Sequence, residues 1–179
     1  MIPDIQLKFQ GGYLRPLTPE DVTEAYMDGI NDPEVNKYLV AVKQEKQSID
    51  TLKSFIESNA QAADAVFFGV WNDQSGALVG TVRLHGIEYT HQTAHIGICL
   101  FDKSVWGKGL GSKAISVVTK WCFSNLRLRW IEAGTYQENH GSRNSFMKAG
   151  YVVVAEIPDK YLLDGKAAPV SILAARNFI

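Results

Sequence analysis

Three glycines separated by single residues give this sequence its clearest chemical signal, in Trp106-Gly107-Lys108-Gly109-Leu110-Gly111-Ser112. They follow an apolar stretch and precede an amphipathic one. Glycine lets the backbone approach a ligand closely and adopt positive φ. Free N–H groups at the start of a helix, with the helix dipole behind them, bind phosphate oxygens. The pattern therefore predicts a loop that cradles a diphosphate.

Two well-known phosphate-binding loops do not fit this spacing. A P-loop needs Gly-Lys followed at once by Ser or Thr, whereas Gly107-Lys108 is followed by Gly109. A dinucleotide-binding fingerprint needs G-x-G-x-x-G in a first βαβ unit, whereas the spacing here is G-x-G-x-G. For the loop considered alone, a glycine-rich turn that binds no ligand stays open as an alternative.

The segments that must position the loop show a change of hydrophobic period along the chain. Thr18 and Pro19 indicate the start of a first helix, Asn31-Asp32-Pro33 ends it, and Ser48 opens another. Further helices are expected over 34–39, from Leu110 for about four turns, and over 141–149. Strands are expected over 13–17, 65–71, 77–87, 93–101, 129–136, 151–157 and 169–175. This order predicts an α+β sheet with one βα unit in its middle, and it argues against a Rossmann fold.

Composition restricts the class of protein. The chain has 179 residues, which predicts one domain over 1–179, and its net charge of −1 provides no field that would attract nucleic acid or an anionic membrane. Neither a secretory signal nor a membrane-spanning stretch is recognisable, so we expect a cytoplasmic protein. Cys99 and Cys122 are expected to be buried, reduced thiols, and no residue pattern predicts a metal site.

The glycine loop resembles the acetyl-CoA pyrophosphate loop of the GNAT acetyltransferases, Q/R-x-x-G-x-G/A. Gly109 and Gly111 match this motif, while Trp106 stands where Gln or Arg is usual. Trp-Gly-Lys-Gly at this point is common in the RimJ/RimL-type branch, the relatives of the ribosomal-protein N-terminal acetyltransferases. Further segments resemble the family in the same chain order, namely 32–39, 94–98, 139–142, 148–151, 159–161 and 164–166. The resemblance thus covers the whole chain.

The resemblance implies a GNAT fold, in which a mixed, mostly antiparallel twisted sheet of about seven strands has its fourth and fifth strands splayed apart and helices at its flanks. It also implies transfer of an acetyl group from acetyl-CoA to a primary amine. The backbone of Ile98, Cys99 and Leu100 would bond the pantetheine arm and polarise the thioester carbonyl. The remaining expected cofactor contacts are Trp106, Gly107, Lys108, Gly109, Leu110, Gly111, Ser112, Asn139 and Ser142.

Catalytic roles follow from the same resemblance. Many relatives carry Glu two residues before the glycine of the fourth strand, and His95 stands there as the expected general base. His85 and Asp159 are weaker candidates. The Tyr that protonates the leaving thiolate in many relatives is replaced by Phe146, so Ser142 is expected to take that role; a helix cap is its alternative. Asn139 could likewise be a turn residue. A covalent acetyl-Cys99 intermediate is disfavoured because no base lies near it in sequence.

The acceptor is expected to contact Asn31, Asn36, Tyr38, His85 and Tyr161, placed there by resemblance. A protein N-terminus, an amino-sugar derivative and an amino acid all stay open as acceptors. The near-zero charge argues against a polyamine. Two other functions also stay open, an acetyl-CoA-binding regulatory domain without catalysis and a nucleotide-binding domain. Monomer and homodimer are both compatible with the sequence.

Overall fold

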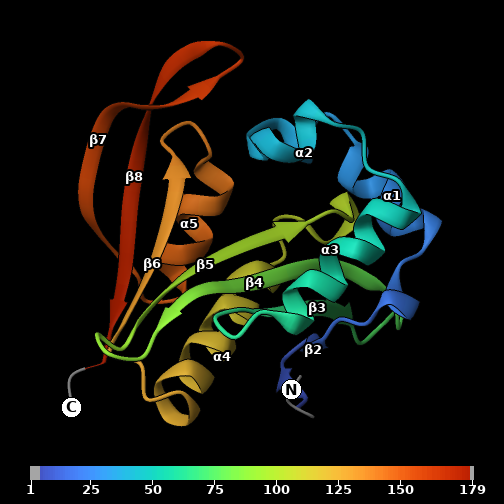
Figure 1. Ribbon diagram of the computed structural model, residues 1–179, viewed down its shortest axis with the longest axis horizontal. Coiled ribbons are helices and arrows are strands. Elements are labelled where there is room, and N and C mark those ends of the chain that lie inside the picture. Colours follow the sequence, from blue (N-terminus) through green and yellow to red (C-terminus); the bar gives the residue numbers. More distant parts are fainter. Residues whose placement is uncertain (1–4, 178–179) are drawn as a thin grey trace.

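An eight-stranded sheet runs through the computed structural model, which describes residues 5–177 (Figure 1). The strands lie side by side in the order β1-β2-β3-β4-β5-β6-β8-β7. All neighbouring strands are antiparallel except β5 and β6, which are parallel and joined by helix α4. The strand bounds are Leu7–Phe9 (β1), Gly12–Pro16 (β2), Val66–Asn72 (β3), Leu78–Glu88 (β4), Thr93–Leu100 (β5), Trp130–Tyr136 (β6), Val152–Leu163 (β7) and Lys166–Arg176 (β8).

The helices cover both faces of this sheet. Their bounds are Glu24–Asn31 (α1), Val40–Gln44 (α2), Ile49–Gln61 (α3), Leu110–Asn125 (α4) and His140–Lys148 (α5), with 3-10 turns at Pro19–Asp21, Asn36–Tyr38 and Lys103–Val105. Apolar side chains of α4 and α5, such as Ile115 and Phe146, pack into the larger core on one face. Tyr26 of α1 and Ile56 of α3 belong to a second core on the other face. The sheet is therefore the middle layer of three.

The α+β class and the parallel βα unit are confirmed, but the sheet has eight strands rather than about seven. The additional strand, β1, has only three residues, and its partner is reached through a tight turn at Gln10 and Gly11. Three residues are too few to show a period of two, so the sequence carried no signal for it. The last two strands are also longer than expected. β7 continues past Pro158 through a register shift in which Asp159 adopts a φ of 55°.

The first helix starts later than predicted. Thr18, Pro19 and Asp21 do form a capping box, but it opens only a 3-10 turn over Pro19–Asp21. The chain then becomes extended at the buried Val22, and Thr23 caps α1 by accepting a hydrogen bond from the Tyr26 amide at 3.2 Å. Two cap-forming threonines lie five residues apart, and burial of Val22 selects the second as the start of the α-helix.

Among the described residues, no helix combines the length and the apolar character that crossing a membrane requires.

Candidate active site

The parallel strands β5 and β6 separate in the middle of the sheet. They pair only over Thr93–His95 and Trp130–Glu132, in the register Thr93↔Trp130, Ala94↔Ile131 and His95↔Glu132. Beyond this point β5 continues to Leu100 along β4, and β6 continues to Tyr136 along β8. The last residues of β5 therefore lack a neighbouring strand on the β6 side within the described chain. The predicted splay is confirmed, and it leaves backbone groups for a ligand.

The glycine loop lies at the mouth of this opening and ends at the first turn of α4. Gly107 and Gly109 have φ values of 72° and 77°, a left-handed backbone that only glycine adopts without strain. Gly109 is the N-cap residue of α4, and among residues 5–177 no side chain caps this helix. The N–H groups of its first turn are thus left for a ligand, with the positive end of the helix dipole behind them.

Small residues keep the space in front of α4 open. A Cβ atom on Gly111 would lie 3.4 Å from Leu100 Cδ1, 3.5 Å from Ser145 Oγ and 3.6 Å from Ile98 Cδ1. A larger side chain at position 111 would therefore fill the gap between α4, α5 and β5. Because the strand splay, the uncapped helix and this gap adjoin one another, the residues present fit a diphosphate followed by a slender arm.

Asn139 and Ser142 approach the same space from α5. Asn139 is the N-cap of this helix, and its Oδ1 accepts a hydrogen bond from the Ser142 amide at 3.1 Å. Asn139 therefore caps the helix, which was the alternative role for Ser142. The side-chain amide nitrogen of Asn139 stays available as a donor to a ligand. Ser142 sits in the first turn, half-buried, with its hydroxyl free of the capping role.

These groups line one cavity of about 460 Å³. It includes almost all of the predicted cofactor contacts, namely Ile98, Cys99, Leu100, Trp106, Gly107, Gly109, Leu110, Gly111, Ser112, Asn139 and Ser142. Lys108 is exposed in the loop and lies outside this lining. Tyr38 is the predicted acceptor-side residue that also lines it. Other lining residues, among them Val105, Ser145 and Lys148, were not predicted from the sequence. Ser145 could have been predicted, because it follows Ser142 by three positions and so shares its helix face.

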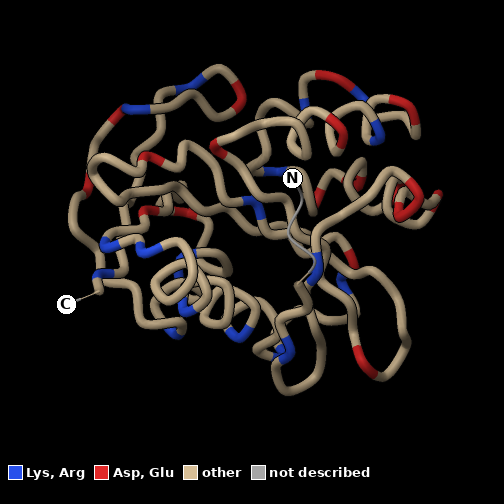
Figure 2. Tube along the Cα trace, turned by 60° about the horizontal axis from the view of Figure 1, so that its bottom comes forward, with Lys and Arg blue, Asp and Glu red and all other residues tan. Residues whose placement is uncertain are grey.

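The α4 and α5 side of the cavity is basic, whereas Glu34 lines the opposite side. The helices on this side carry Lys113, Lys120, Arg143 and Lys148 and have no acidic residue in their sequences. Figure 2 shows Lys and Arg positions along the helical coils at the lower left, whereas Asp and Glu positions are frequent along the helical segments at the upper right. Together with the dipole of α4, the basic side chains favour phosphate groups.

The thiol of Cys99 lines the cavity without being reactive. Its burial raises its pKa to about 12, so the thiol is protonated at neutral pH. A protonated thiol is a weak nucleophile. The same holds for Cys122, which is fully buried in α4 and whose pKa burial also raises to about 12. Both cysteines are free thiols, but only Cys122 is buried as expected, whereas Cys99 is partly buried at the edge of the cavity.

The two candidate histidines lie outside the cavity, on the face of the sheet that α1 and α3 cover in part. His85 of β4 pairs with His95 of β5 across the strands, and their rings are stacked with centroids 5.5 Å apart. His95 is exposed, whereas partial burial, followed by the charges of Arg83 and His95, lowers the pKa of His85. By strand alternation His95 faces the same side as Cys99, at a distance of about 13 Å along the strand.

The acceptor-side residues divide into two groups. Tyr38 contacts Tyr136 with ring centroids 5.7 Å apart, and Tyr136 contacts Tyr161 of the β7–β8 hairpin at 6.0 Å. These three rings form a continuous aromatic wall next to the cavity. Asn31 and Asn36 instead hold the local backbone: Asn31 binds Gln47 through both of its side-chain atoms, and the buried Asn36 donates to the Ile30 carbonyl at 3.2 Å.

Ion pairs connect the segment 32–43, which precedes α3, to the chain before the glycine loop and to the β7–β8 hairpin. Lys103, just before the glycine loop, contacts Asp32 at 2.7 Å and Glu34 at 3.0 Å. On the other side, Lys43 of α2 pairs with Asp164 at the tip of the β7–β8 hairpin. Asp159 is exposed on β7 and lies outside the lining of the cavity. The acceptor side is therefore assembled from segments distant in sequence.

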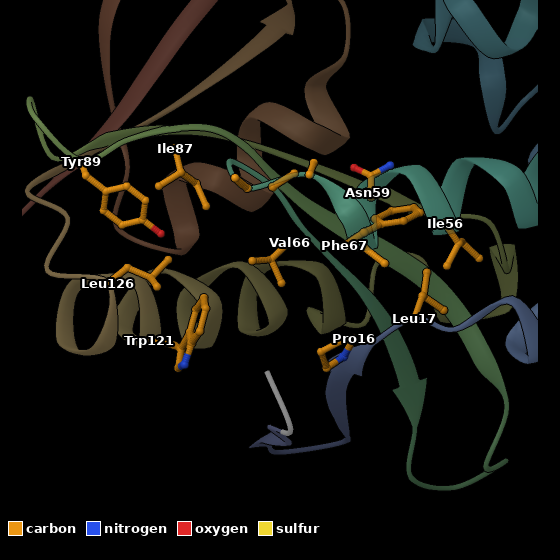
Figure 3. Close-up of a pocket in the computed structure, with 14 residues that line it drawn as sticks. Pro16, Leu17, Ile56, Asn59, Val66, Phe67, Ile87, Tyr89, Trp121 and Leu126 are labelled. Atoms are coloured by element: carbon orange, nitrogen blue, oxygen red, sulfur yellow. The ribbon is translucent and has the colours of Figure 1, made fainter. Parts of the chain in front are cut away.

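A second cavity, of about 260 Å³, lies between α3, β3 and the C-terminal end of α4 (Figure 3). Phe67, Tyr89, Trp121 and Leu126 are among the side chains around it. None of the described residues that line it is Asp, Glu, His, Lys, Arg or Cys. Its described lining therefore lacks the charged side chains that bind an anionic cofactor, whereas the cavity at the strand splay adjoins the glycine loop and the uncapped start of α4 and is the candidate active site.

Comparisons with known proteins agree with this geometry. A family model described as "Acetyltransferase (GNAT) domain" matches residues 13–152. The Bacillus subtilis protein named "Uncharacterized N-acetyltransferase YoaA" is 28% identical over 140 residues, which is 77% of each chain. "Probable N-acetyltransferase YjcK" of the same organism is 40% identical over 85 residues, which is 47% of this chain and 46% of that protein.

Solved structures share the fold. A GNAT-family acetyltransferase from Bacillus anthracis has a TM-score of 0.82 at 22% identity, covering 96% of this chain and 98% of its own. Spermidine N-acetyltransferase from Vibrio cholerae, solved with CoA and spermine, has a TM-score of 0.81 at 21% identity and 94% and 96% coverage. Ribosomal-protein-S5-alanine acetyltransferase from Vibrio fischeri has a TM-score of 0.78 at 21% identity, with 97% of each chain covered.

The family match spans most of the chain, and the structure supplies the features that such a match requires, a splayed parallel strand pair and an uncapped helix behind a glycine loop. The chain belongs to the GNAT acetyltransferase family and is an acetyl-CoA-dependent N-acetyltransferase.

Proposed function

We propose that this protein transfers the acetyl group of acetyl-CoA to a primary amine by direct attack within a ternary complex, and that it belongs to the RimJ/RimL-type branch. The acceptor is the amine of a small molecule, such as an amino acid or amino sugar, or a protein N-terminus. The observation that carries the proposal is the adjacency of the β5–β6 splay to the uncapped start of α4. Trp106-Gly107-Lys108-Gly109 and the ribosomal-protein acetyltransferase among the structural neighbours support the branch.

The residues of the chain divide the binding of the donor between them. The amides from Gly107 to Ser112 hold the diphosphate, and Lys108 and Lys148 add positive charge beside it. The backbone of Ile98, Cys99 and Leu100 orients the arm along the splay and presents N–H donors to the thioester oxygen. When bound, acetyl-CoA supplies an activated acetyl group. Asn139 contributes its amide nitrogen, since its oxygen is already used in capping α5.

His95 is the group that removes the proton from the acceptor ammonium. It lies on the same face as Cys99 but about 13 Å away along the strand, so the proton reaches its imidazole through a chain of several water molecules. Burial and neighbouring positive charge keep the stacked His85 in its neutral form, which limits repulsion when His95 becomes charged. His85 supports His95 in this scheme and does not receive the proton itself.

Ser142 assists the departure of the thiolate. Its hydroxyl lines the cavity at the start of α5, where the helix dipole also favours a developing negative charge. Phe146, which replaces the tyrosine of many relatives, is buried in the core and packs against Tyr151. Ser145 lines the same side of α5, but its hydroxyl already donates to the Gly141 carbonyl at 2.8 Å, so we assign the role to Ser142.

The function is tested in two steps. First, thermal unfolding is followed with acetyl-CoA, CoA, ATP and NAD; we expect protection by acetyl-CoA and CoA. Protection by ATP or NAD alone would instead support a nucleotide-binding domain. Second, CoA release is followed with amino acids, amino sugars, spermidine and short peptides. Turnover with any of these supports the enzyme, whereas tight CoA binding without turnover across the panel would support a regulatory domain.

A substitution tests the base. We expect His95→Gln to lower kcat by about 100-fold while the affinity for CoA stays unchanged, because the imidazole lies outside the cofactor cavity. The matched variant His85→Gln should retain most of the activity. If both variants turn over at the wild-type rate, His95 is not the base.

A further inference from the structure

Each of the two strands carries a glycine just past the point where β5 and β6 begin to separate. The last register pair between these strands is His95↔Glu132. The same register, continued for two residues along each strand, places Gly97 opposite Gly134. Because side chains alternate along a strand, Gly97 shares a face with His95 and Cys99, and Gly134 shares that face with Glu132 and Tyr136. The face therefore has a gap between two pairs of side chains.

Neither glycine is required by the fold. Both are exposed, and neither has a positive φ. A Cβ atom on Gly97 would have no described atom within 4 Å, and one on Gly134 would have only Ile172 Cδ1, at 3.8 Å. Gly69 of β3 and Gly80 of β4 differ from these two glycines because they have no room for a side chain. A Cβ atom on Gly69 would lie 2.5 Å from the Trp71 ring, and one on Gly80 would lie 2.6 Å from the Cys99 carbonyl oxygen.

Packing thus explains Gly69 and Gly80, but it does not explain Gly97 or Gly134. Glycine inside a strand weakens the strand, and it often marks a place where a ligand approaches the backbone closely. The gap lies directly between the exposed imidazole of His95 and the part of β5, Ile98–Leu100, that borders the cofactor cavity. In the proposed function, the path from an acyl group held beside Cys99 to the imidazole of His95 runs over this gap.

From this juxtaposition we infer that Gly97 and Gly134 form the floor of the acceptor site and set the size of the group attached to the amine-bearing carbon. The inference rests on the proposed function. Because Gly97 of β5 and Gly134 of β6 have no side chain, there is space above the strands for a substituent on that carbon. The site therefore takes primary amines on a branched carbon, and an added methyl group on either strand would exclude the branch while leaving an unbranched amine room.

The test measures binding of CoA derivatives that carry the acceptor part covalently. CoA is alkylated on sulfur with N-methyl- or N-isopropyl-chloroacetamide, and the dissociation constants of both conjugates and of CoA are measured by calorimetry. We expect the wild type to bind both conjugates more tightly than CoA. Gly97→Ala and Gly134→Ala should weaken binding of the isopropyl conjugate by about tenfold, that of the methyl conjugate much less, and that of CoA not at all.

Thr93→Ile is the matched control, since Thr93 lies on the same face of β5 but on the far side of His95 from the gap. It should leave all three affinities unchanged. Both alanine variants should melt at or above the wild-type temperature, because alanine restricts the unfolded chain more than glycine does. Equal affinity of wild type and alanine variants for the isopropyl conjugate would overturn the inference while leaving the proposed function intact. Absence of CoA binding to the wild type would overturn both.

Discussion

The indole Nε1 of Trp106 donates a hydrogen bond of 2.8 Å to the backbone carbonyl of Leu100. It ties the start of the glycine loop to the last residue of β5, so the diphosphate side and the thioester side of the cavity keep a fixed separation. The ring itself is 38% exposed, which means that the bond rather than deep burial holds it in place.

Replacing Trp106 by Phe removes this bond but keeps an aromatic ring. A single hydrogen bond contributes about 1 kcal/mol, so we expect the CoA dissociation constant to rise about fivefold. Trp130→Phe is the control, because its indole bonds Glu132 at 2.7 Å outside the cofactor cavity. Calorimetric titration with CoA measures both. An unchanged affinity in Trp106→Phe would show that the loop keeps its position without the indole.

Gly109→Ala should weaken both folding and cofactor binding. Its φ of 77° lies in the left-handed region, where alanine costs about 1–2 kcal/mol, and relief of that strain would turn the amides of the first turn of α4 away from the phosphates. Gly76 has a φ of 66° in the β3–β4 turn, far from the cavity, so Gly76→Ala should lower only the melting temperature. Equal loss of CoA affinity in the two variants would argue against the loop as the phosphate site.

Ser142→Ala should lower kcat by about 100-fold with little change in KM for acetyl-CoA, because the hydroxyl acts on the leaving thiolate. The helix should remain intact, since Asn139 and not Ser142 provides its cap. Steady-state kinetics with the best acceptor of the amine panel decides the matter. An unchanged kcat would dismiss Ser142 as the proton donor.

Cys99→Ala should retain turnover. Because burial raises the pKa of this thiol to about 12, it is protonated at working pH and cannot accept the acetyl group at a useful rate. Intact-protein mass spectrometry of the wild type with acetyl-CoA and no acceptor should show no added acetyl group. An acetylated enzyme whose label is lost on Cys99→Ala would establish a covalent route instead.

His85 makes stability depend on pH. Its folded-state pKa is lowered, so the unfolded chain binds more protons as pH falls through about 6.5, the ordinary value for histidine. The free energy of unfolding should therefore decrease from pH 7.5 towards pH 5.5, and His85→Gln should reduce that decrease. Urea titrations at the two pH values provide the measurement, with His91→Gln on the exposed β4–β5 turn as control. Identical pH dependence in wild type and His85→Gln would contradict this assignment.

The cofactor half of the site could be predicted because its determinants are local. The glycine loop, the strand before it and the turn at Asn139 all lie within about fifty residues, and motif spacing places them directly. The acceptor half could not be derived in this way. Tyr136 comes into contact with Tyr38 and Tyr161 only through the order of the strands in the sheet. Asn31 and Asn36 look like exposed polar residues in the sequence, but the structure shows them bonded to the backbone of Gln47 and of Ile30.

The predicted ends of helices and strands were wrong where a second local signal lay close to the first or where a strand continued past an irregularity. The cap at Thr18 was real but was followed by a second at Thr23, and the strand expected over 151–157 continues through an irregularity at Pro158 and Asp159. Gly97 served only to place His95, and Gly134 carried no signal, because the relation between the two glycines depends on two strands separated by α4.

The salt bridge between Lys43 and Asp164 shows which segments of the chain could be exchanged to change acceptor selectivity. It joins the first quarter of the chain to the last tenth, whereas the residues that grip the donor are contributed by one continuous stretch in between. Recognition of the second substrate thus depends on segments separate from those that bind the donor. Exchange of either outer segment for that of a relative offers a way to redirect selectivity without rebuilding the middle.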